Sequence, residues 1–396
     1  MQKLILLLSI FYSSLTHSDS AWPKESLQLA NNFKYPFQNS FSGTVWSSCN
    51  SRNDSNLRLP GKLVEKDFYN PYYDNDNFNS TFILQHENDE LKKAPTIVLI
   101  NGLFGDPLSG VARQLANILL KTGHNIIALG NPLGPKNIAQ KPRYALGNFL
   151  KEGEAFLVNV DNAINWLNSK DLVEGDVKLL SVSYGSFVGA ILKALDNKRE
   201  KPLLKGVMTL LSPAQEMDVA LYNMDDILIE SQPVGKLADW MIMFKSIRYC
   251  YLPFKAEPNQ KQLITLKAIF SYLGFQRWLA DQTIVIDKLY DLNKVPADKR
   301  TRTKWRRTFS FRDYLNNFSP ELKDLMKSEK GKLIFWLNQL PQNNYRILTT
   351  LDDPLNDGIQ EKWTDFDNVI KLPQGGHYGL RAFPFFEKFL DSSFSD

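Results

Sequence analysis

Ser183 stands in the segment SVSYGS, residues 181–186, between two apolar runs of different period. The run before it, VKLL, has the length of a short buried strand, and the run after it, FVGAILKAL, has the apolar spacing of a helix. A serine between small residues on so short a strand-to-helix turn is typical of a nucleophile elbow. Such a serine can attack an acyl carbon if a base, an orienting carboxylate and two N–H donors lie close to it.

The chain has four histidines that could serve as the base. His17 falls in an apolar N-terminal segment, His86 in a polar loop, and His124 in a turn between a predicted helix and a predicted strand. His377 follows the predicted strand VIKL in the segment LPQGGHYGL, where two glycines allow the backbone to bring the imidazole over the edge of a sheet. We therefore predict that His377 is the base.

The orienting carboxylate is predicted in the segment ILTTLDDPLND, directly after the strand-like run YRILTT. Asp352 and Asp353 both stand at the C-terminal end of this run, where the active sites of open parallel sheets form. Asp357 and, at a greater distance, Asp218 are alternative acids, and an Asx turn that only caps the loop is the structural alternative. The chain order serine, aspartate, histidine is that of hydrolases built on such a sheet.

The elements that must position these residues alternate between strand and helix from about residue 79. The strand-like runs are STFILQH, TIVLI, NIIALG, VKLLSV and GVMTLLS, with helical patterns between them. This alternation predicts a mostly parallel sheet with helices on both faces. It stops near Pro213, residues 214–340 are helical and irregular, and strand patterns return with YRILTT and NVIKLP. A long insertion between two strands of one sheet is typical of a lid or cap domain.

The combined pattern resembles the alpha/beta-hydrolase superfamily over residues 79–213 and 341–396. The resemblance implies an alpha/beta-hydrolase fold with a helical lid insertion. It also implies that Ser183 is the nucleophile, that Asp353, which directly precedes a proline, is the acid, and that His377 is the base.

An oxyanion hole is implied by the same resemblance, in the segment NGLFG after the strand-like run TIVLI. Its donors would be the backbone N–H groups of Leu103 and Tyr184. Two departures from the family pattern stand here: Asn101 replaces the usual histidine, and Ser181 and Ser186 stand where glycines are frequent. The substitutes are small or polar, so we expect the turns to form.

The N-terminal part of the chain precedes this core. Lys3, an apolar stretch over residues 4–15 and small residues after it are typical of a secretory signal peptide, and the stretch is shorter than the about 20 residues that cross a bilayer. We therefore predict a secreted or periplasmic protein. The predicted domains are a signal peptide (1–20), a loop-rich extension with an edge hairpin (21–78), the first core part (79–213), the lid (214–340) and the second core part (341–396).

Net charge and cysteine content limit which binding partners, disulfides and metal sites the chain can have. The formal net charge is +4, from 47 basic and 43 acidic side chains, so the overall balance does not favour nucleic acid as a partner. Cys49 and Cys250 are the only cysteines, and an oxidising compartment would permit them to pair. We expect no cofactor and no metal, because no histidine or cysteine cluster has ligand spacing.

One segment, residues 294–312, concentrates eight basic side chains against the single acidic residue Asp298. Trp305, Phe309 and Phe311 are interleaved with the charges. The favoured interpretation is a solvated lid surface whose aromatic side chains turn toward the core. Binding of lipid headgroups or of an anionic substrate beside the lid is the alternative.

These observations lead to the hypothesis of a serine hydrolase that cleaves carboxylic esters of apolar acyl groups through an acyl-enzyme. An acyltransferase or thioesterase on the same triad is the alternative among enzymes, and a catalytically silent binding protein of the same fold is the alternative outside them. The expected partner is a small ester, with transient contact to a lipid surface as a further possibility. The sequence leaves the acyl-chain length and the oligomeric state open.

Overall fold

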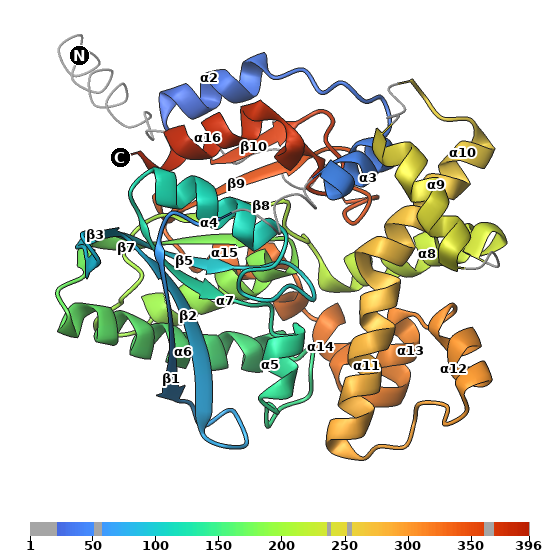
Figure 1. Cartoon of the computed structure of the whole chain (residues 1–396), viewed down its shortest axis with the longest axis horizontal. Helices are drawn as coiled ribbons and strands as arrows, with labels where there is room; N and C mark the ends of the chain where they lie inside the picture. Colours follow the sequence, from blue (N-terminus) through green and yellow to red (C-terminus); the bar gives the residue numbers. More distant parts are fainter. Residues whose placement is uncertain (1–21, 51–57, 236–238, 252–255, 360–367, 396) are drawn as a thin grey trace, which may run out of the picture.

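The computed structural model describes residues 22–50, 58–235, 239–251, 256–359 and 368–395 (Figure 1). Eight strands of this described part form one sheet in the order β1-β2-β6-β5-β7-β8-β9-β10. The pairs β1/β2 and β2/β6 are antiparallel and the other pairs are parallel. The strands are β1 (Lys62–Tyr69), β2 (Asn77–Leu84), β5 (Ala94–Ile100), β6 (Asn125–Leu129), β7 (Val173–Val182), β8 (Met208–Leu211), β9 (Tyr345–Thr350) and β10 (Val369–Leu372). The predicted mostly parallel sheet is confirmed.

Helices cover both faces of the sheet, which is why its central strands are continuous apolar runs rather than alternating ones. On one face α4 (Val111–Lys121) and α16 (Pro384–Phe394) pack in one buried cluster. On the other face lie α6 (Phe149–Ser169) and α7 (Tyr184–Asn197), whose cluster continues into the helical insertion. The α6 side chains spaced four and three residues apart are fully or almost fully buried, as their period predicts: Phe156, Val160, Ile164 and Leu167.

The N-terminal extension differs from the prediction. Two helices, α2 (Lys24–Asn32) and α3 (Ser40–Asn50), stand where we expected loops, so that expectation was wrong for these residues. The Ser-rich sequence of α3, SFSGTVWSSCN, has little helix propensity, and short helices such as α2 and α3 are stabilised mainly by tertiary packing. Ser26 of α2 contacts Ser392 and Ser393 of α16 through hydroxyl hydrogen bonds of 2.8 and 3.0 Å. An antiparallel edge hairpin is formed by β1 and β2, but β2 lies mostly in the stretch that we predicted as the first strand of the core.

The helical insertion runs between β8 and β9, which are adjacent parallel strands. Figure 1 shows most of its helices gathered on one side of the sheet. A single π-helical turn, η2, separates two of them. The elements are α8 (Met217–Gly235), α9 (Asp239–Tyr251), α10 (Gln260–Ser271), η2 (Tyr272–Gln276), α11 (Arg277–Tyr290), α12 (Lys299–Arg306), α13 (Phe311–Phe318), α14 (Leu322–Lys327) and α15 (Leu333–Leu337).

A disulfide joins the extension to the insertion. Cys49 of α3 is bonded to Cys250 of α9, and their Cα atoms lie 5.4 Å apart. Helix α3 also packs against α9 and α10. The pairing that the sequence left open is therefore formed between two segments that are 201 residues apart.

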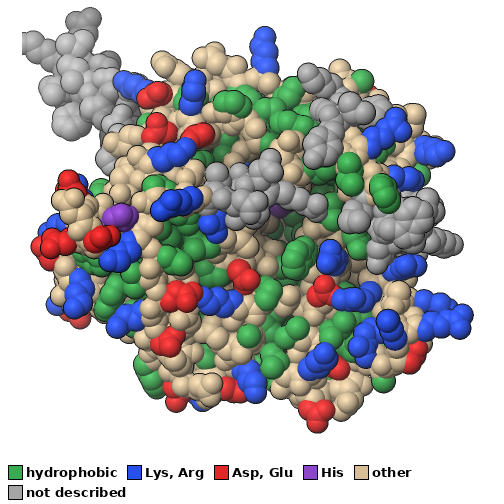
Figure 2. All heavy atoms as spheres, viewed as in Figure 1, with side chains coloured by type: hydrophobic (Ala, Val, Ile, Leu, Met, Phe, Trp, Pro, Cys, Tyr) green, Lys and Arg blue, Asp and Glu red, His purple; other side chains and the backbone are tan. Residues whose placement is uncertain are grey.

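The basic segment 294–312 forms α12 and the start of α13. Figure 2 shows its lysine and arginine side chains at one edge of the molecule, and α12 has no buried residue. Phe309 and Phe311 are buried and Trp305 is half-buried, so the aromatic side chains turn inward as the solvated-surface interpretation expects. Binding of lipid headgroups stays a prediction.

No helix in the described ranges is long and apolar enough to cross a membrane. The predicted signal peptide, residues 1–20, lies outside those ranges.

Candidate active site

Ser183 lies on the turn between β7 and α7, with φ 53° and ψ −125°. Residues other than glycine rarely adopt this backbone conformation, and its strain is typical of functional turns. The turn is held at both ends, because the Ser183 N–H donates to the Leu211 carbonyl (2.9 Å) and the Ser186 N–H donates to the Ser183 carbonyl (2.9 Å). The expected strand-to-helix elbow is therefore present, with the serine at its apex.

Two glycines let this elbow approach its neighbours. A Cβ atom on Gly185 would overlap the backbone oxygen of Asn101, so only glycine allows the first turn of α7 to pack on the loop after β5. A Cβ atom on Gly189 would lie 2.8 Å from the Ser181 hydroxyl. Ser181 thus fits where the family often has glycine, because the facing residue on α7 is itself a glycine.

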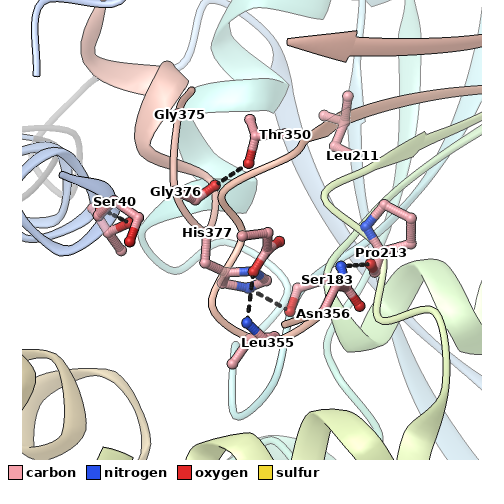
Figure 3. A network of polar contacts seen from close by, with 12 residues as sticks. Ser40, Ser183, Leu211, Pro213, Thr350, Leu355, Asn356, Gly375, Gly376 and His377 are labelled. Atoms are coloured by element: carbon pink, nitrogen blue, oxygen red, sulfur yellow. Dashed lines mark hydrogen bonds and ion pairs between the residues drawn. The ribbon is translucent and has the colours of Figure 1, made fainter. Parts of the chain in front are cut away.

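Ser183, His377 and Asp353 lie in one line of hydrogen bonds. Ser183 Oγ is 2.9 Å from His377 Nε2, and His377 Nδ1 is 3.0 and 3.2 Å from the two carboxylate oxygens of Asp353. Asp353 is fully buried and also accepts a hydrogen bond from the Leu355 N–H (2.9 Å). Figure 3 shows His377 between Ser183 and the loop that carries Leu355. These three residues are far apart along the chain, and the fold brings their side chains into contact.

The other candidate acids lie elsewhere. The carboxylate of Asp352 accepts a hydrogen bond from the Gly376 N–H (2.8 Å), and burial raises its pKa even though that bond opposes the shift. Asp218 lies at the start of α8, where it accepts from the N–H of Val219 (2.9 Å). Asp357 is exposed in the loop after β9. The contact with the imidazole is made by Asp353, the residue before the proline.

The loop that carries His377 is packed on α3. Gly376 has φ +58°, and a Cβ atom there would overlap the Thr44 hydroxyl and the Ser40 carbonyl of α3. The Gly376 carbonyl accepts from Thr350 Oγ1 at 2.8 Å (Figure 3), and the Ser47 hydroxyl of α3 donates to the Gly379 carbonyl. The sequence analysis missed this support because it placed no helix over residues 40–50.

The turn after β5 places Leu103 beside the elbow. The Asn101 side chain accepts a hydrogen bond from the Gly102 N–H (2.8 Å) and donates to the Asp106 carbonyl (2.8 Å). Phe104 continues the turn with φ 59°. Asn101 therefore holds the turn by its amide in the position where the family usually has a histidine. Leu103 and Tyr184, the two predicted oxyanion donors, both line a pocket that contains Ser183.

The order of these parts along the sheet decides the fold. The serine follows a central parallel strand, the buried aspartate follows β9, the histidine follows β10, and an antiparallel hairpin forms the opposite edge. The chain has the alpha/beta-hydrolase fold. The helical insertion follows β8, which lies next to β7, the strand that leads into Ser183.

Comparison with known proteins gives distant likenesses only. No family model matches this chain, and no curated protein matches it. Similar solved structures include a lipase in its open form, with 15% identity over 84% of this chain and 97% of that chain and a TM-score of 0.45. One of two fungal esterases from Rhizomucor miehei has 11% identity over 96% and 95% of the two chains and a TM-score of 0.43. An esterase from Pyrobaculum calidifontis has 11% identity over 94% and 97% and a TM-score of 0.43.

Ser183 lies where two pockets meet. The first is lined almost wholly by apolar side chains, from the core and from helices α8, α11 and α13 of the insertion. The second is wider and more polar, and Asp106, Trp278, His377 and Arg381 belong to its wall. The alpha/beta-hydrolase core thus presents the serine hydroxyl to one apolar and one polar space.

No group of three or more histidine, cysteine, aspartate or glutamate side chains in the described segments could hold a metal ion.

A buried carboxyl group, that of Glu152, is hydrogen-bonded to the side chain of Tyr184. Glu152 of α6 is fully buried, accepts a hydrogen bond from the Tyr184 hydroxyl (2.5 Å) and accepts another from the Gly147 N–H (2.7 Å). Burial raises the pKa of Glu152 to about 7, although both hydrogen bonds lower it. The sequence analysis missed Glu152. Its position four residues before Phe156, on the apolar face of α6, was the available signal.

Replacing Glu152 by glutamine is expected to change how stability depends on pH. The folded pKa is raised above the unfolded value, so the folded protein binds the extra proton and loses stability as the pH rises from about 4.5 to about 7. Glutamine does not ionise; its oxygen can still accept from the Gly147 N–H, and its NH2 group can donate to the Tyr184 hydroxyl oxygen, which reverses the direction of that hydrogen bond. Relative to the wild type, Glu152→Gln should therefore gain about 3 kcal/mol in free energy of unfolding between pH 5 and pH 8.

Urea unfolding at the two pH values measures this change. Glu174→Gln, at an exposed position of β7, is the matched control and should follow the wild type. A difference between Glu152→Gln and the wild type that stays constant with pH would show that the carboxyl ionises as easily in the folded protein as in the unfolded chain.

Proposed function

We propose that this protein is a serine hydrolase that cleaves carboxylic esters of apolar acyl groups through an acyl-enzyme. The observation that carries the proposal is the hydrogen-bonded line from Ser183 through His377 to the buried Asp353. A serine hydroxyl within 2.9 Å of an imidazole nitrogen can lose its proton to that nitrogen as it attacks a carbonyl carbon.

The steps follow from this geometry. Ser183 attacks the ester carbonyl while His377 takes the hydroxyl proton, and Asp353 stabilises the imidazolium and holds its tautomer. The N–H groups of Leu103 and Tyr184 stabilise the oxyanion. His377 then gives the proton to the leaving alcohol. Water repeats the sequence on the acyl-enzyme, so the acid is released and the serine is restored.

The two pockets support a proposal for where each part of the ester binds, the acyl chain in one pocket and the alcohol in the other. The lining of the apolar pocket suits an acyl chain in character, because each methylene group removed from water contributes about 0.8 kcal/mol to binding. The wider, more polar pocket fits the alcohol. Helices α8, α11 and α13 supply much of the apolar wall, which supports the role of residues 214–340 as a lid over the acyl chain.

We also propose that the protein is secreted or periplasmic. The apolar N-terminal segment has the composition of a signal peptide. The Cys49–Cys250 disulfide supports the same location, since disulfides persist in oxidising compartments.

A fluorophosphonate probe tests the proposed function, with intact-mass measurement and peptide mapping as the readout. We expect one label per chain, on Ser183, because its hydroxyl is the one held against a base and beside oxyanion donors. Labelling should be lost in Ser183→Ala and kept in Ser186→Ala, which changes a buried hydroxyl of the same elbow. A panel of p-nitrophenyl esters of increasing acyl length then measures turnover.

Labelling that persists in Ser183→Ala would contradict the assignment of the nucleophile. A chain that neither reacts with the probe nor hydrolyses any ester of the panel would instead be a binding protein of this fold.

A further inference from the structure

Among the residues that the structure describes, the wall of the apolar pocket beside Ser183 includes one buried polar side chain with an atom that has no hydrogen-bond partner. Gln282 of α11 belongs to the pocket wall and is 5% exposed. Its Oε1 atom is buried and accepts no hydrogen bond from any residue that the structure describes. The residues around it in the wall include Leu279 and Ile286 on the same helix.

The other hydroxyl groups of this wall, apart from Ser183, cannot satisfy that oxygen. Thr283 Oγ1 donates its proton to the Leu279 carbonyl (2.7 Å), the Tyr314 hydroxyl donates to the Leu146 carbonyl (2.9 Å), and the Tyr184 hydroxyl donates to Glu152 (2.5 Å). Each hydroxyl has one proton to donate, so none of them can also serve Gln282.

An unpaired amide oxygen in this place is costly. A buried polar group left without a partner destabilises the folded protein, and methionine would occupy a similar volume without that penalty. Buried polar side chains are paired in the large majority of cases, often with water or a ligand. The donor that pairs with Gln282 would therefore enter the pocket from outside the chain.

We propose that Gln282 is a specificity-determining residue that pairs with a hydroxyl group on the acyl chain, so that the preferred substrates are hydroxyacyl esters. This inference rests on the proposed function. An O–H group suits the amide in either orientation, since it can donate to Oε1 and accept from Nε2. A cationic donor does not suit the site, because the lining residues that the structure describes include no carboxylate, and an unpaired buried charge is far more costly than a hydroxyl.

Ester turnover by wild type and Gln282→Met tests the inference. The substrates are p-nitrophenyl octanoate and the corresponding 3-, 5- and 8-hydroxyoctanoates. With the wild type, we expect at least one hydroxyoctanoate to match or exceed the octanoate in kcat/KM. In Gln282→Met that ratio should fall by about tenfold or more, because the hydroxyl then loses its partner inside an apolar pocket.

Gln276→Met is the matched control. Gln276 is also buried, with an unpaired amide nitrogen, but it precedes α11 and lies outside the lining of the apolar pocket. The same substitution there should leave the hydroxyoctanoate-to-octanoate ratio within about threefold of the wild type, a change of less than about 1 kcal/mol.

A ratio that is equal in wild type and Gln282→Met for every hydroxyl position would overturn the inference. So would a wild type that rejects all three hydroxyoctanoates by tenfold or more, as a purely apolar pocket would.

Binding to Ser183→Ala separates this inference from the proposed function, because it needs no turnover. Calorimetry should show that the hydroxyoctanoic acid at the favoured position binds more tightly than octanoic acid, and that Gln282→Met or Gln282→Leu reverses the order. If no ester is hydrolysed, the proposed function fails while this measurement still decides the role of Gln282. Equal affinities for all the acids would reject it.

Discussion

Replacing Ser183 by alanine is expected to lower kcat for ester hydrolysis by about 10^6, the scale seen when a triad nucleophile is removed. The alanine variant keeps the oxyanion donors and the pocket, so it should still accelerate hydrolysis over the uncatalysed rate by about 10^3. Steady-state kinetics with a p-nitrophenyl ester measures the loss. Circular dichroism should show the same folded fraction as the wild type.

The double variant Ser183→Ala/His377→Ala makes this prediction sharper. Triad residues act as a unit, so the second substitution should lower kcat by less than about threefold beyond the first. Two losses that simply multiply would show that His377 acts independently of Ser183, contrary to the 2.9 Å contact between them.

The second large effect separates two adjacent aspartates. Asp353→Asn is expected to lower kcat by about 10^3 to 10^4, because the amide removes the charge that stabilises the imidazolium and favours the wrong tautomer. Asp353 reaches His377 Nδ1 with both carboxylate oxygens, at 3.0 and 3.2 Å. Kinetics at equal folded fraction, judged by circular dichroism and thermal midpoint, measures the effect.

Asp352→Asn is the matched control for that variant. Its side-chain oxygen can still accept the hydrogen bond from the Gly376 N–H, so the loop that carries His377 should keep its position. We expect a loss of under about tenfold, which corresponds to about 1.4 kcal/mol of barrier. The reverse ranking would assign the acid to Asp352. Two small effects would point to Asp218 or to a serine–histidine pair that needs no carboxylate.

The part of the site that sequence could predict is the part that local pattern determines. Ser183, Asp353 and His377 each follow a strand-like run, and the ends of parallel strands meet at one edge of a sheet. Their proximity follows from the fold class without any knowledge of side-chain packing. The distinction between Asp352 and Asp353, by contrast, depends on which way each side chain leaves the strand end, and the structure supplies it.

Helix α3 could not be predicted in the same way. Its sequence, SFSGTVWSSCN, has no clear apolar period, and its stability comes from contacts with the His377 loop and with α9 and α10. Such contacts join residues that are hundreds of positions apart. Glu152 and Gln282 are different cases: each stands on the apolar face of a helix, where a period-based interpretation treats the position as buried but does not reveal what the polar group pairs with.

The Cys49–Cys250 bond has a mechanical consequence for substrate entry. It closes a covalent ring that contains the nucleophile, while the acid and the base lie outside the ring on the later part of the chain. The ring is fastened at α3, and α3 is also the surface on which the His377 loop rests. Helix α9 therefore cannot move away from the sheet independently of α3, because the disulfide joins the two helices. A movement of α3 would in turn displace the loop that carries His377. Any opening of the insertion over Ser183 would therefore have to leave this corner of α3 and α9 in place.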